Sequence, residues 1–488
     1  MKRDLTLSIA ALSIPSVRLL SVTSCQLFAV SAVFWGAPAL ALPQGADIRA
    51  GDVAITETAR QMQIQQSSQK AIINYDSFNI GADETVNINQ PNANSVLVNR
   101  VNAGGPMSEI YGQLQSNGQV FLINQAGILV GDSAQINVGG LLLTTHDISD
   151  ESLLSNDLQF MTSGKPAMVQ IDGNITVDPG SFVIVLSEQI DLGGDIIAQF
   201  GQVSLVSADG ASVLLQPGEW PQIQVTQATY DAWIHQHGLI KAEGGFVEIT
   251  AASASDLIDR VIYHEGTTDV STTSFVERDG KVFIETAKTG IAINTNDTSG
   301  YAEIAGTIDA SGDRADGSQH EIDIEGEAVF ITETAEILNN GDQGNGGDTR
   351  IIANSLSVAE GSNVEAKGGT QGDGGFVELS GHTELEINGR VDTSAENGQT
   401  GELYIDPRNI VINNAATTSM TSNVDSGTNT YSPTNNSAIL NVTNLQDALA
   451  LNNVTVTTAD GGAGTQAGNL TVDSDIDIDQ ANGNTLTL

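Results

Sequence analysis

Short apolar runs separated by turn residues fill residues 99–145, and this pattern limits the fold more than any other feature. The runs VFLI, GILV and GLLL follow one another with Gly, Asn and Ser between them. None shows the 3.6-residue period of a helix, and each is too short for one. The stretch therefore predicts short stacked strands that are joined by tight turns.

Repeats carry the same pattern towards the C-terminus. GGFVEIT at 244–250 recurs as GGFVELS at 374–380, and GTIDASG at 306–312 recurs as GRVDTSA at 389–395. Acidic residues and Ile alternate in EIDIE at 321–325 and in DSDIDID at 473–479, as in a strand with one solvent-exposed and one buried face. Strand-and-turn units of this kind predict a parallel β-helix. With about 22 residues and about 4.8 Å per turn, the chain after a leader would make about 20 turns, roughly 100 Å in all.

Composition agrees with a repeat fold and argues against some partners. Among 488 residues there are 51 Gly and only 5% aromatic residues, so a core must be built mainly from small aliphatic side chains. Sixty acidic residues against 18 basic ones give a net charge of −42. Nucleic-acid binding needs clustered Lys and Arg, so no nucleic-acid partner is expected. The acidity is expected to keep the chain soluble.

The first 41 residues have the pattern of an export signal. Lys2 and Arg3 precede an apolar stretch that is densest at 27–41, and Ala39-Leu40-Ala41 suits cleavage after Ala41. We therefore expect a signal peptide at 1–41 and no permanent membrane anchor. A lipoprotein start at Cys25 is less favoured, because a long apolar run follows it. Cleavage after Ala41 would leave a chain without cysteine.

Several motifs between residues 66 and 145 resemble one known family. They are Q-x-S-x-K-A-I-I-N at 66–74, S-F-N-I-G at 77–81, Gln90-Pro91, Asn99-Arg100-Val101, S-x-I-x-G-x-L at 108–114 and V-F-L-I-N at 120–124. This set is similar to the secretion domain of filamentous haemagglutinin-type exoproteins, which belong to two-partner secretion systems. The resemblance implies a right-handed, pectin-lyase-like parallel β-helix with short loops outside it.

The same resemblance implies a function and partners. The family is exported by an outer-membrane transporter whose periplasmic polypeptide-binding domains recognise the secretion domain. We therefore expect a secreted or surface-exposed, adhesin-like or haemagglutinin-like exoprotein that reaches a host-cell or glycan receptor. A contact-dependent toxin or haemolysin with the same secretion domain is the nearest alternative. A β-helical polysaccharide lyase or hydrolase and an autotransporter passenger are more distant ones.

Five residues stand where the resemblance places the secretion motif. They are Asn99, Arg100, Asn124, Gly127 and Ile128. The family's Asn-Pro-Asn-Gly-Ile turn reads Asn-Gln-Ala-Gly-Ile at 124–128, so the rigid Pro and the second Asn are missing. Gly still permits the positive φ of a turn. Arg100 either faces a partner or pairs with an internal carboxylate, and the sequence leaves both open.

The predicted organisation has five parts. The signal peptide is followed by a secretion domain at 42–290, a β-helical shaft at 291–412, a Ser/Thr/Asn-rich linker at 413–436, and further, truncated repeats at 437–488. A short helix is expected at 444–451. The polar segments 149–165 and 216–237 are expected to project from the stack.

No enzymatic, cofactor or metal site is predicted. His235-x-His237 lacks a third ligand and is interpreted as a solvated loop. GDQGNGGDTRI at 341–351 departs from a calcium-binding repeat at Arg350 and is interpreted as a Gly-rich corner. The acidic pairs at 309 and 313 and at 473 and 475 are interpreted as outer-face ladders.

Overall fold

The structure is a computed structural model whose described part begins at residue 42. Within 42–488 it leaves out residues 156, 163, 217–218, 255–259, 273–274, 279–280, 285–289, 296–299, 315–316, 416–419, 426–427, 434–437, 459–467 and 477–482, together with the side chains of 273–290 and 416–437. The expected signal peptide at 1–41 therefore lies outside the described residues. Among the described residues, no helix is long and apolar enough to cross a membrane.

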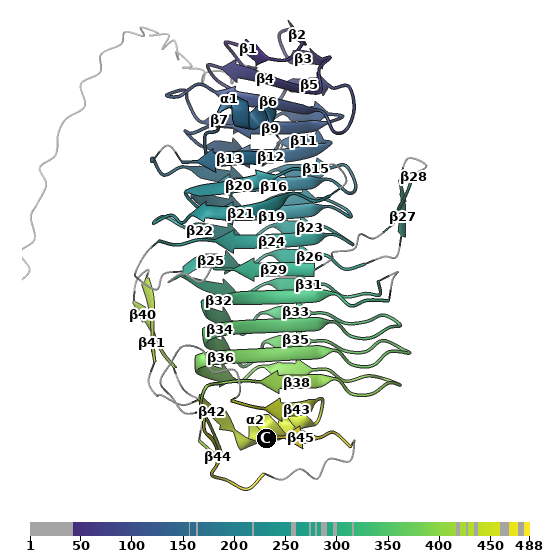
Figure 1. Ribbon diagram of the computed structural model, residues 1–488, viewed down its shortest axis with the longest axis vertical. Coiled ribbons are helices and arrows are strands. Elements are labelled where there is room, and N and C mark those ends of the chain that lie inside the picture. The colour runs from purple at the N-terminus through teal and green to yellow at the C-terminus, as the bar shows by residue number, and fades with distance from the viewer. Residues whose placement is uncertain are drawn as a thin grey trace, which may run out of the picture. The chain divides into compact units, whose positions relative to one another are not determined.

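Three ladders of parallel strands wind into a β-helix, which confirms the fold class (Figure 1). The first ladder contains β4 (Lys70–Tyr75), β6 (Val96–Val101), β9 (Gln119–Ile123), β12 (Gly140–Thr144), β16 (Phe182–Ser187), β19 (Gln202–Ser207), β24 (Phe246–Ala251), β29 (Gly290–Asn294), β32 (Glu321–Ile331), β34 (Asp348–Val358), β36 (Phe376–Ile387), β38 (Glu402–Ile405), β43 (Asn453–Val456) and β45 (Leu486–Thr487). Neighbouring strands in the ladder are consecutive turns of the helix.

The second ladder runs beside the first and merges with it. It contains β7 (Ser108–Ile110), β10 (Ile128–Val130), β14 (Met168–Ile171), β17 (Gln189–Leu192), β22 (Trp233–Gln236), β25 (Arg260–His264) and β30 (Tyr301–Ile304). The long strand β32 pairs with β29 through its first half and with β30 through its second half. The single long strands β32, β34 and β36 therefore supply both faces.

The third ladder closes each turn. It contains β3 (Gln61–Gln66), β5 (Thr85–Asn89), β8 (Gln113–Ser116), β11 (Gln135–Val138), β15 (Asn174–Val177), β18 (Asp195–Ile197), β23 (Leu239–Lys241), β26 (Thr267–Asp269), β31 (Thr307–Asp309), β33 (Glu336–Leu338), β35 (Asn363–Glu365) and β37 (Arg390–Asp392). Two antiparallel strands, β1 (Asp47–Ala50) on β4 and β2 (Val53–Glu57) on β3, cover the first turn. They pair with edges that parallel strands would otherwise leave open.

Aliphatic side chains stacked turn upon turn fill the interior. One column of the third ladder, with every member at most 4% exposed, consists of Val86, Leu114, Ile136, Ile175, Ile196, Ile240, Thr268, Ile308, Ile337, Val364 and Val391. Thr268 is the polar exception, and its hydroxyl lies 2.9 Å from His264 Nε2 inside the core. Small β-branched residues suit such a column because each packs against its own kind above and below.

Asp-x-Ser corners explain the repeated turn units. The carboxylates of Asp269, Asp309 and Asp392 each accept a hydrogen bond of 2.9 Å from the amide of the Ser two residues later. Each Asp ends a strand of the third ladder. The Asp309 carboxylate thus serves a turn, and that of Asp313 accepts amide hydrogen bonds of 2.8–3.0 Å from residues 342–344. The Gly-rich segment before β34 is therefore a corner, as expected.

Turn length and local assignments differ from the expectations in several places. β6 and β9 begin 23 residues apart, near the expected 22, but β32, β34 and β36 begin 27 and 28 residues apart because their strands serve two faces. The expected linker at 413–436 contains the hairpin β40 (Met420–Asp425) and β41 (Thr428–Pro433). Its Thr residues, which are β-branched, suit paired strands. The segment 473–476 forms no strand, since β44 (Leu470–Val472) ends before it.

The expected short helix is confirmed. Of the segments that were expected to project from the stack, only part does. α2 (Val442–Leu449) begins after Asn441, whose side chain accepts a hydrogen bond from the Thr443 amide, and buries Leu445. It follows β42 (Ala438–Asn441), which pairs with β39 (Ile410–Asn413). In 216–237, β21 (Gln222–Gln227) lies outside the ladders but β22 belongs to the second ladder. The interpretation of His235 as part of a loop was therefore wrong.

Candidate functional site

The outer face of the first ladder is apolar in its early turns and charged in its later ones. One outward column begins with Ile72, Val98, Phe121, Leu142 and Ile184. It continues through Ser204, Glu248, Ala292, Asp323, Arg350 and Glu378. This change explains why VFLI and GLLL are continuous apolar runs, whereas EIDIE alternates. Strands that are buried on both faces need apolar residues at every position.

A second layer covers the apolar part of this face. It consists of α1 (Asp150–Leu154) and the antiparallel strands β13 (Asp157–Met161), β20 (Gly210–Leu214) and β21. Leu153, Leu158, Phe160 and Val213 pack with the outward column in a core separate from the helix interior. The segment that was expected to project at 149–165 instead lies against the stack.

Two cations on the first ladder hold α1. The guanidinium of Arg100 donates to Asp150 Oδ1 at 2.6 Å and to the Ile148 carbonyl at 2.7 Å. Lys70 Nζ donates to the carbonyls of Leu153 and Leu154 at 3.4 and 2.9 Å, which lie at the C-terminal end of α1. A cation there satisfies carbonyls that the helix leaves free. Partial burial lowers the pKa of the Lys70 ammonium.

The structure resolves the alternative that the sequence left open for Arg100. Its side chain is 13% exposed and lies 3.6 Å from Asp147 Oδ1 in addition to the Asp150 contact. Arg100 pairs with the carboxylates of Asp147 and Asp150, which are 48% and 41% exposed, and attaches the second layer to the β-helix. Its role in transporter recognition stays a prediction. The neighbouring Asn99 points into the helix interior, is 0% exposed and lies 3.5 Å from the Phe121 carbonyl.

The Asn124 turn is an internal brace. Asn124 Nδ2 donates to the Pro106 carbonyl and to Ser108 Oγ, both at 2.9 Å, and its Oδ1 accepts from the Ala126 amide. Gly127 has a φ of +109°, which other residues rarely adopt. Ile128 begins β10 and is 1% exposed. In the folded domain the Asn124 and Ile128 side chains are thus closed to a partner, and the role of these residues in transporter recognition stays a prediction.

A buried polar cluster joins the two layers. The Thr145 hydroxyl donates to Glu188 Oε2 at 3.0 Å and lies 2.9 Å from Ser187 Oγ. His146 Nε2 lies 2.8 Å from the Ala208 carbonyl, and burial lowers the pKa of its imidazole. Thr145, His146 and Ser187 are at most 2% exposed. These contacts hold the second layer against the β-helix.

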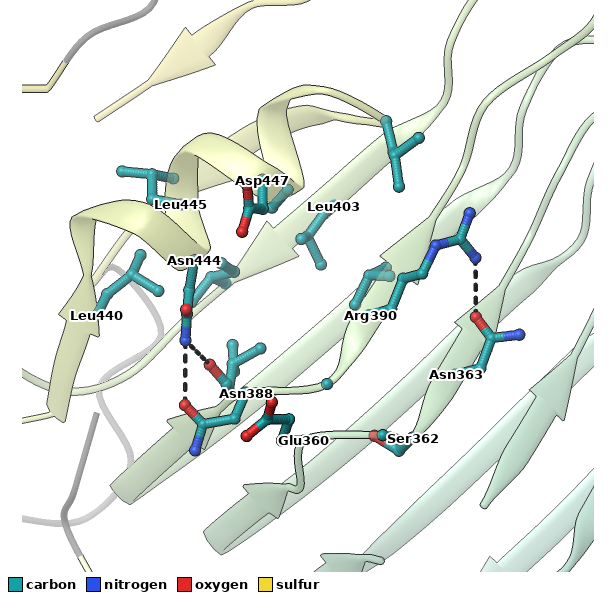
Figure 2. A pocket seen from close by; sticks show the side chains of 17 residues that line it. Glu360, Ser362, Asn363, Asn388, Arg390, Leu403, Leu440, Asn444, Leu445 and Asp447 are labelled. Carbon is teal, nitrogen blue, oxygen red and sulfur yellow. Dashed lines mark hydrogen bonds between the residues drawn. The ribbon is translucent and has the colours of Figure 1, made fainter. Parts of the chain in front are cut away.

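Near the last described turns, α2 and the strands before it enclose a cavity of about 720 Å³ (Figure 2). Leu403, Leu440 and Leu445 supply apolar walls, and the polar side chains around them include Arg390, which donates to Asn363 Oδ1 at 2.9 Å. The size is that of small-molecule sites. No motif predicted this cavity, because its walls come from segments that lie far apart in the chain.

Sequence reasoning missed three residues around Arg100. Lys70 lies within the K-A-I-I-N motif, so the family resemblance included this residue. Nothing in the sequence indicated its contact with α1. Asp147 and Asp150 lie in a polar stretch without a pattern. The structure brings Lys70, Arg100 and the two aspartates together at α1, whereas the Asn124 turn lies at the corner between β9 of the first ladder and β10 of the second.

This geometry defines a parallel β-helix whose first turns carry an extra apolar layer. Comparison with known proteins supplies the family. A family model described as the TPS secretion domain matches residues 39–289, which is more than half of the chain. The chain belongs to this family of two-partner secretion proteins, as the motifs predicted.

Curated relatives and a solved structure agree with this assignment. A heme/hemopexin-binding protein of Haemophilus influenzae strain Rd is 31% identical over 208 residues, or 41% of this chain and 23% of the relative. A second Haemophilus influenzae protein of that name is 44% identical over 124 residues, or 25% of this chain and 13% of the relative. The chain thus spans less than a quarter of either relative.

The crystal structure of the HMW1 secretion domain from Haemophilus influenzae is similar in fold. It matches with a TM-score of 0.64 and 26% identity over 75% of this chain and 95% of that domain. The match supports the β-helix and its secretion-domain character together.

Proposed function

We propose that this chain is an exoprotein whose residues 42–290 are a secretion domain recognised by an outer-membrane partner transporter. The family match at 39–289 is the observation that carries this proposal. Residues 1–41 would bring the chain across the inner membrane, and the transporter would then move it to the cell surface or the medium. The lack of any cysteine after Cys25 supports this route, because a disulfide would hinder passage of an extended chain.

The boundary at residue 290 is functional in this proposal and not a break in the fold. β24, β29 and β32 pair in unbroken register across it. What changes along the chain is the outer face, since the apolar second layer extends no further than Ala252, directly after β24. We propose that residues 42–290, which include all the covered turns, make up the recognised domain and that the following turns, 291–412, form a shaft.

A binding experiment tests recognition directly. Immobilised periplasmic polypeptide-binding domains of the matched transporter should capture residues 42–290 and should not capture residues 291–488 of the same chain. Both fragments should first show the circular dichroism of β structure. Equal capture of both fragments, or of neither, would contradict the proposed recognition.

For the exported chain we propose adhesion. The features that support it are the long shaft and two hairpins, β27–β28 (Phe275–Arg278 and Lys281–Ile284) and β40–β41, which form sheets of their own outside the ladders. Such elements offer contact surfaces without disturbing the stack. Deleting residues 420–433 should lower binding of the purified chain to host cells, while its secretion stays unchanged. Undiminished cell binding would count against the hairpin as a contact surface.

The relatives favour a second candidate, namely binding of a haem-carrying protein. Both curated relatives are named heme/hemopexin-binding proteins, and one is 44% identical over its matched segment. Surface plasmon resonance with this chain immobilised, and with hemopexin and haem alone as separate analytes, distinguishes binding of the carrier protein from binding of haem itself. Saturable hemopexin binding would favour this candidate over adhesion.

A further inference from the structure

An outward-facing cluster on the second ladder contains two histidines and an aspartate from consecutive turns. Asp191 of β17 and His235 of β22 are paired in register, and His237 follows two residues later on the same side. Sequence reasoning found only the two histidines, because the third group lies 44 residues earlier in the chain. The winding of the β-helix brings it beside them.

We propose that Asp191, His235 and His237 bind a divalent transition-metal ion, with Zn²⁺ as the best match. Two imidazoles and one carboxylate form a donor set that zinc uses with water at the fourth position. Hard cations such as Ca²⁺ prefer more oxygen ligands than this cluster offers.

The spacing of the three donor atoms fits such an ion. Asp191 Oδ1 lies 3.2 Å from His235 Nδ1 and 3.2 Å from His237 Nε2. All three atoms lie within 4.8 Å of one another. Ligands that are about 2.0–2.1 Å from a tetrahedral zinc ion are about 3.3–3.4 Å apart. The rings of His235 and His237 are stacked, with centroids 4.3 Å and planes 25° apart, so one ring must rotate to turn its nitrogen towards the ion. The side chains of Asp191 and His235 are 22% exposed and that of His237 is 34% exposed, which leaves the ion a path from solvent.

Neighbouring groups orient the first histidine. Its other ring nitrogen, Nε2, lies 3.3 Å from Glu265 Oε1, as expected of a carboxylate that fixes the ring of a metal ligand. The Tyr263 ring stacks on that of His235 with centroids 5.1 Å apart and planes 4° apart. The nearby positive charge of Arg260 is paired with Glu303 at 3.1 Å and lies over the Tyr263 ring. The cluster therefore offers ligands, a supporting carboxylate and little opposing charge.

An ion at this position would link two consecutive turns of the stack. β17 and β22 are hydrogen-bonded neighbours, and the insertion with β20 and β21 lies between them in the chain. The ion would serve as a cross-link in a chain that has no cysteine after residue 25. The metal site would form only after both turns have stacked.

Isothermal titration calorimetry of the purified, exported chain with Zn²⁺ tests the proposal. We expect one ion per chain, and at least tenfold weaker binding in Asp191→Asn and in His237→Ala. Glu265→Gln should weaken binding by about tenfold, the low end for a supporting carboxylate. His382→Ala removes a histidine of β36 outside the cluster and should bind as the wild type does. Ca²⁺ in place of Zn²⁺ should give no saturable heat.

Thermal melts provide a second reading that separates folding from binding. Zn²⁺ should raise the melting temperature of the wild type and of His382→Ala, and EDTA should reverse the rise. Asp191→Asn and His237→Ala should melt like the wild type in EDTA but gain nothing from Zn²⁺. No binding by the wild type up to 1 mM Zn²⁺, about the weakest affinity that would matter here, or unchanged binding by both variants, would overturn the proposal.

Discussion

At the scale of single residues, the attachment of α1 depends on Arg100. Arg100→Ala should lower the free energy of unfolding by about 2 kcal/mol, because charge-assisted hydrogen bonds to Asp150 and the Ile148 carbonyl are lost from a largely buried site. Guanidinium denaturation measures this loss, and hydrogen exchange should show faster exchange at 148–161. Arg60→Ala is the control, since Arg60 and Asp83 lie 3.7 Å apart and are 74% and 80% exposed. It should change stability by less than about 0.5 kcal/mol, and equal effects of the two substitutions would refute the clamp.

Also at this scale, His264 makes stability depend on pH. It is 0% exposed, and burial lowers its pKa from 6.5 to about 4. The unfolded chain therefore binds a proton between these values that the folded chain does not, so stability falls as the pH drops from 6.5 to 4. The full loss is about 3 kcal/mol. His264→Gln should flatten this part of the curve of unfolding free energy against pH, relative to the wild type. Parallel curves for the two proteins would show that His264 does not contribute.

At the scale of strands and corners, a column of glycines lets successive turns approach. A Cβ on Gly194, Gly238, Gly266 or Gly306 would lie 2.0–2.2 Å from the carbonyl oxygen of the glycine one turn earlier. Gly238→Ala should therefore cost about 1–3 kcal/mol of stability through overpacking against backbone that cannot move alone. Gly104→Ala is the comparison, because its site is open and only its φ of +83° is strained. Chemical denaturation that ranked Gly238→Ala as the milder substitution would contradict the account.

An element can be predicted from the sequence when the interactions that form it join residues close together in the chain. Repeats such as GGFVEIT and GGFVELS are local, and they predicted strands that indeed occupy matching places in β24 and β36. The clamp on α1 and the ligand Asp191 depend on residues that stacking brings together across one or more turns. A single sequence does not show which residues of such segments lie opposite one another, so Lys70 and Asp191 were missed. The burial of Asn99 and Asn124 was not predicted either, since their hydrogen-bond partners lie 16–22 residues away in the chain.

At the scale of the whole molecule, two kinds of surface divide one continuous stack. The early turns bury an outward apolar column under α1, β13, β20 and β21, while the later turns present charges such as Asp323, Arg350 and Glu378. Each turn packs on the one before it, so the antiparallel strands at the first turn are a natural place for the stack to begin. A chain that emerges from a transporter with its N-terminal domain first would fold in the same order.

Secretion of residues 1–290 is the measurement that tests this account most directly. The fragment is expressed in a Gram-negative host with and without the matched partner transporter, and its amount in the medium and in the periplasm is measured by immunoblot. We predict release into the medium only when the transporter is present. A fragment that stays in the periplasm beside a transporter that exports its own known substrate would contradict the assignment of a secretion domain to this β-helix.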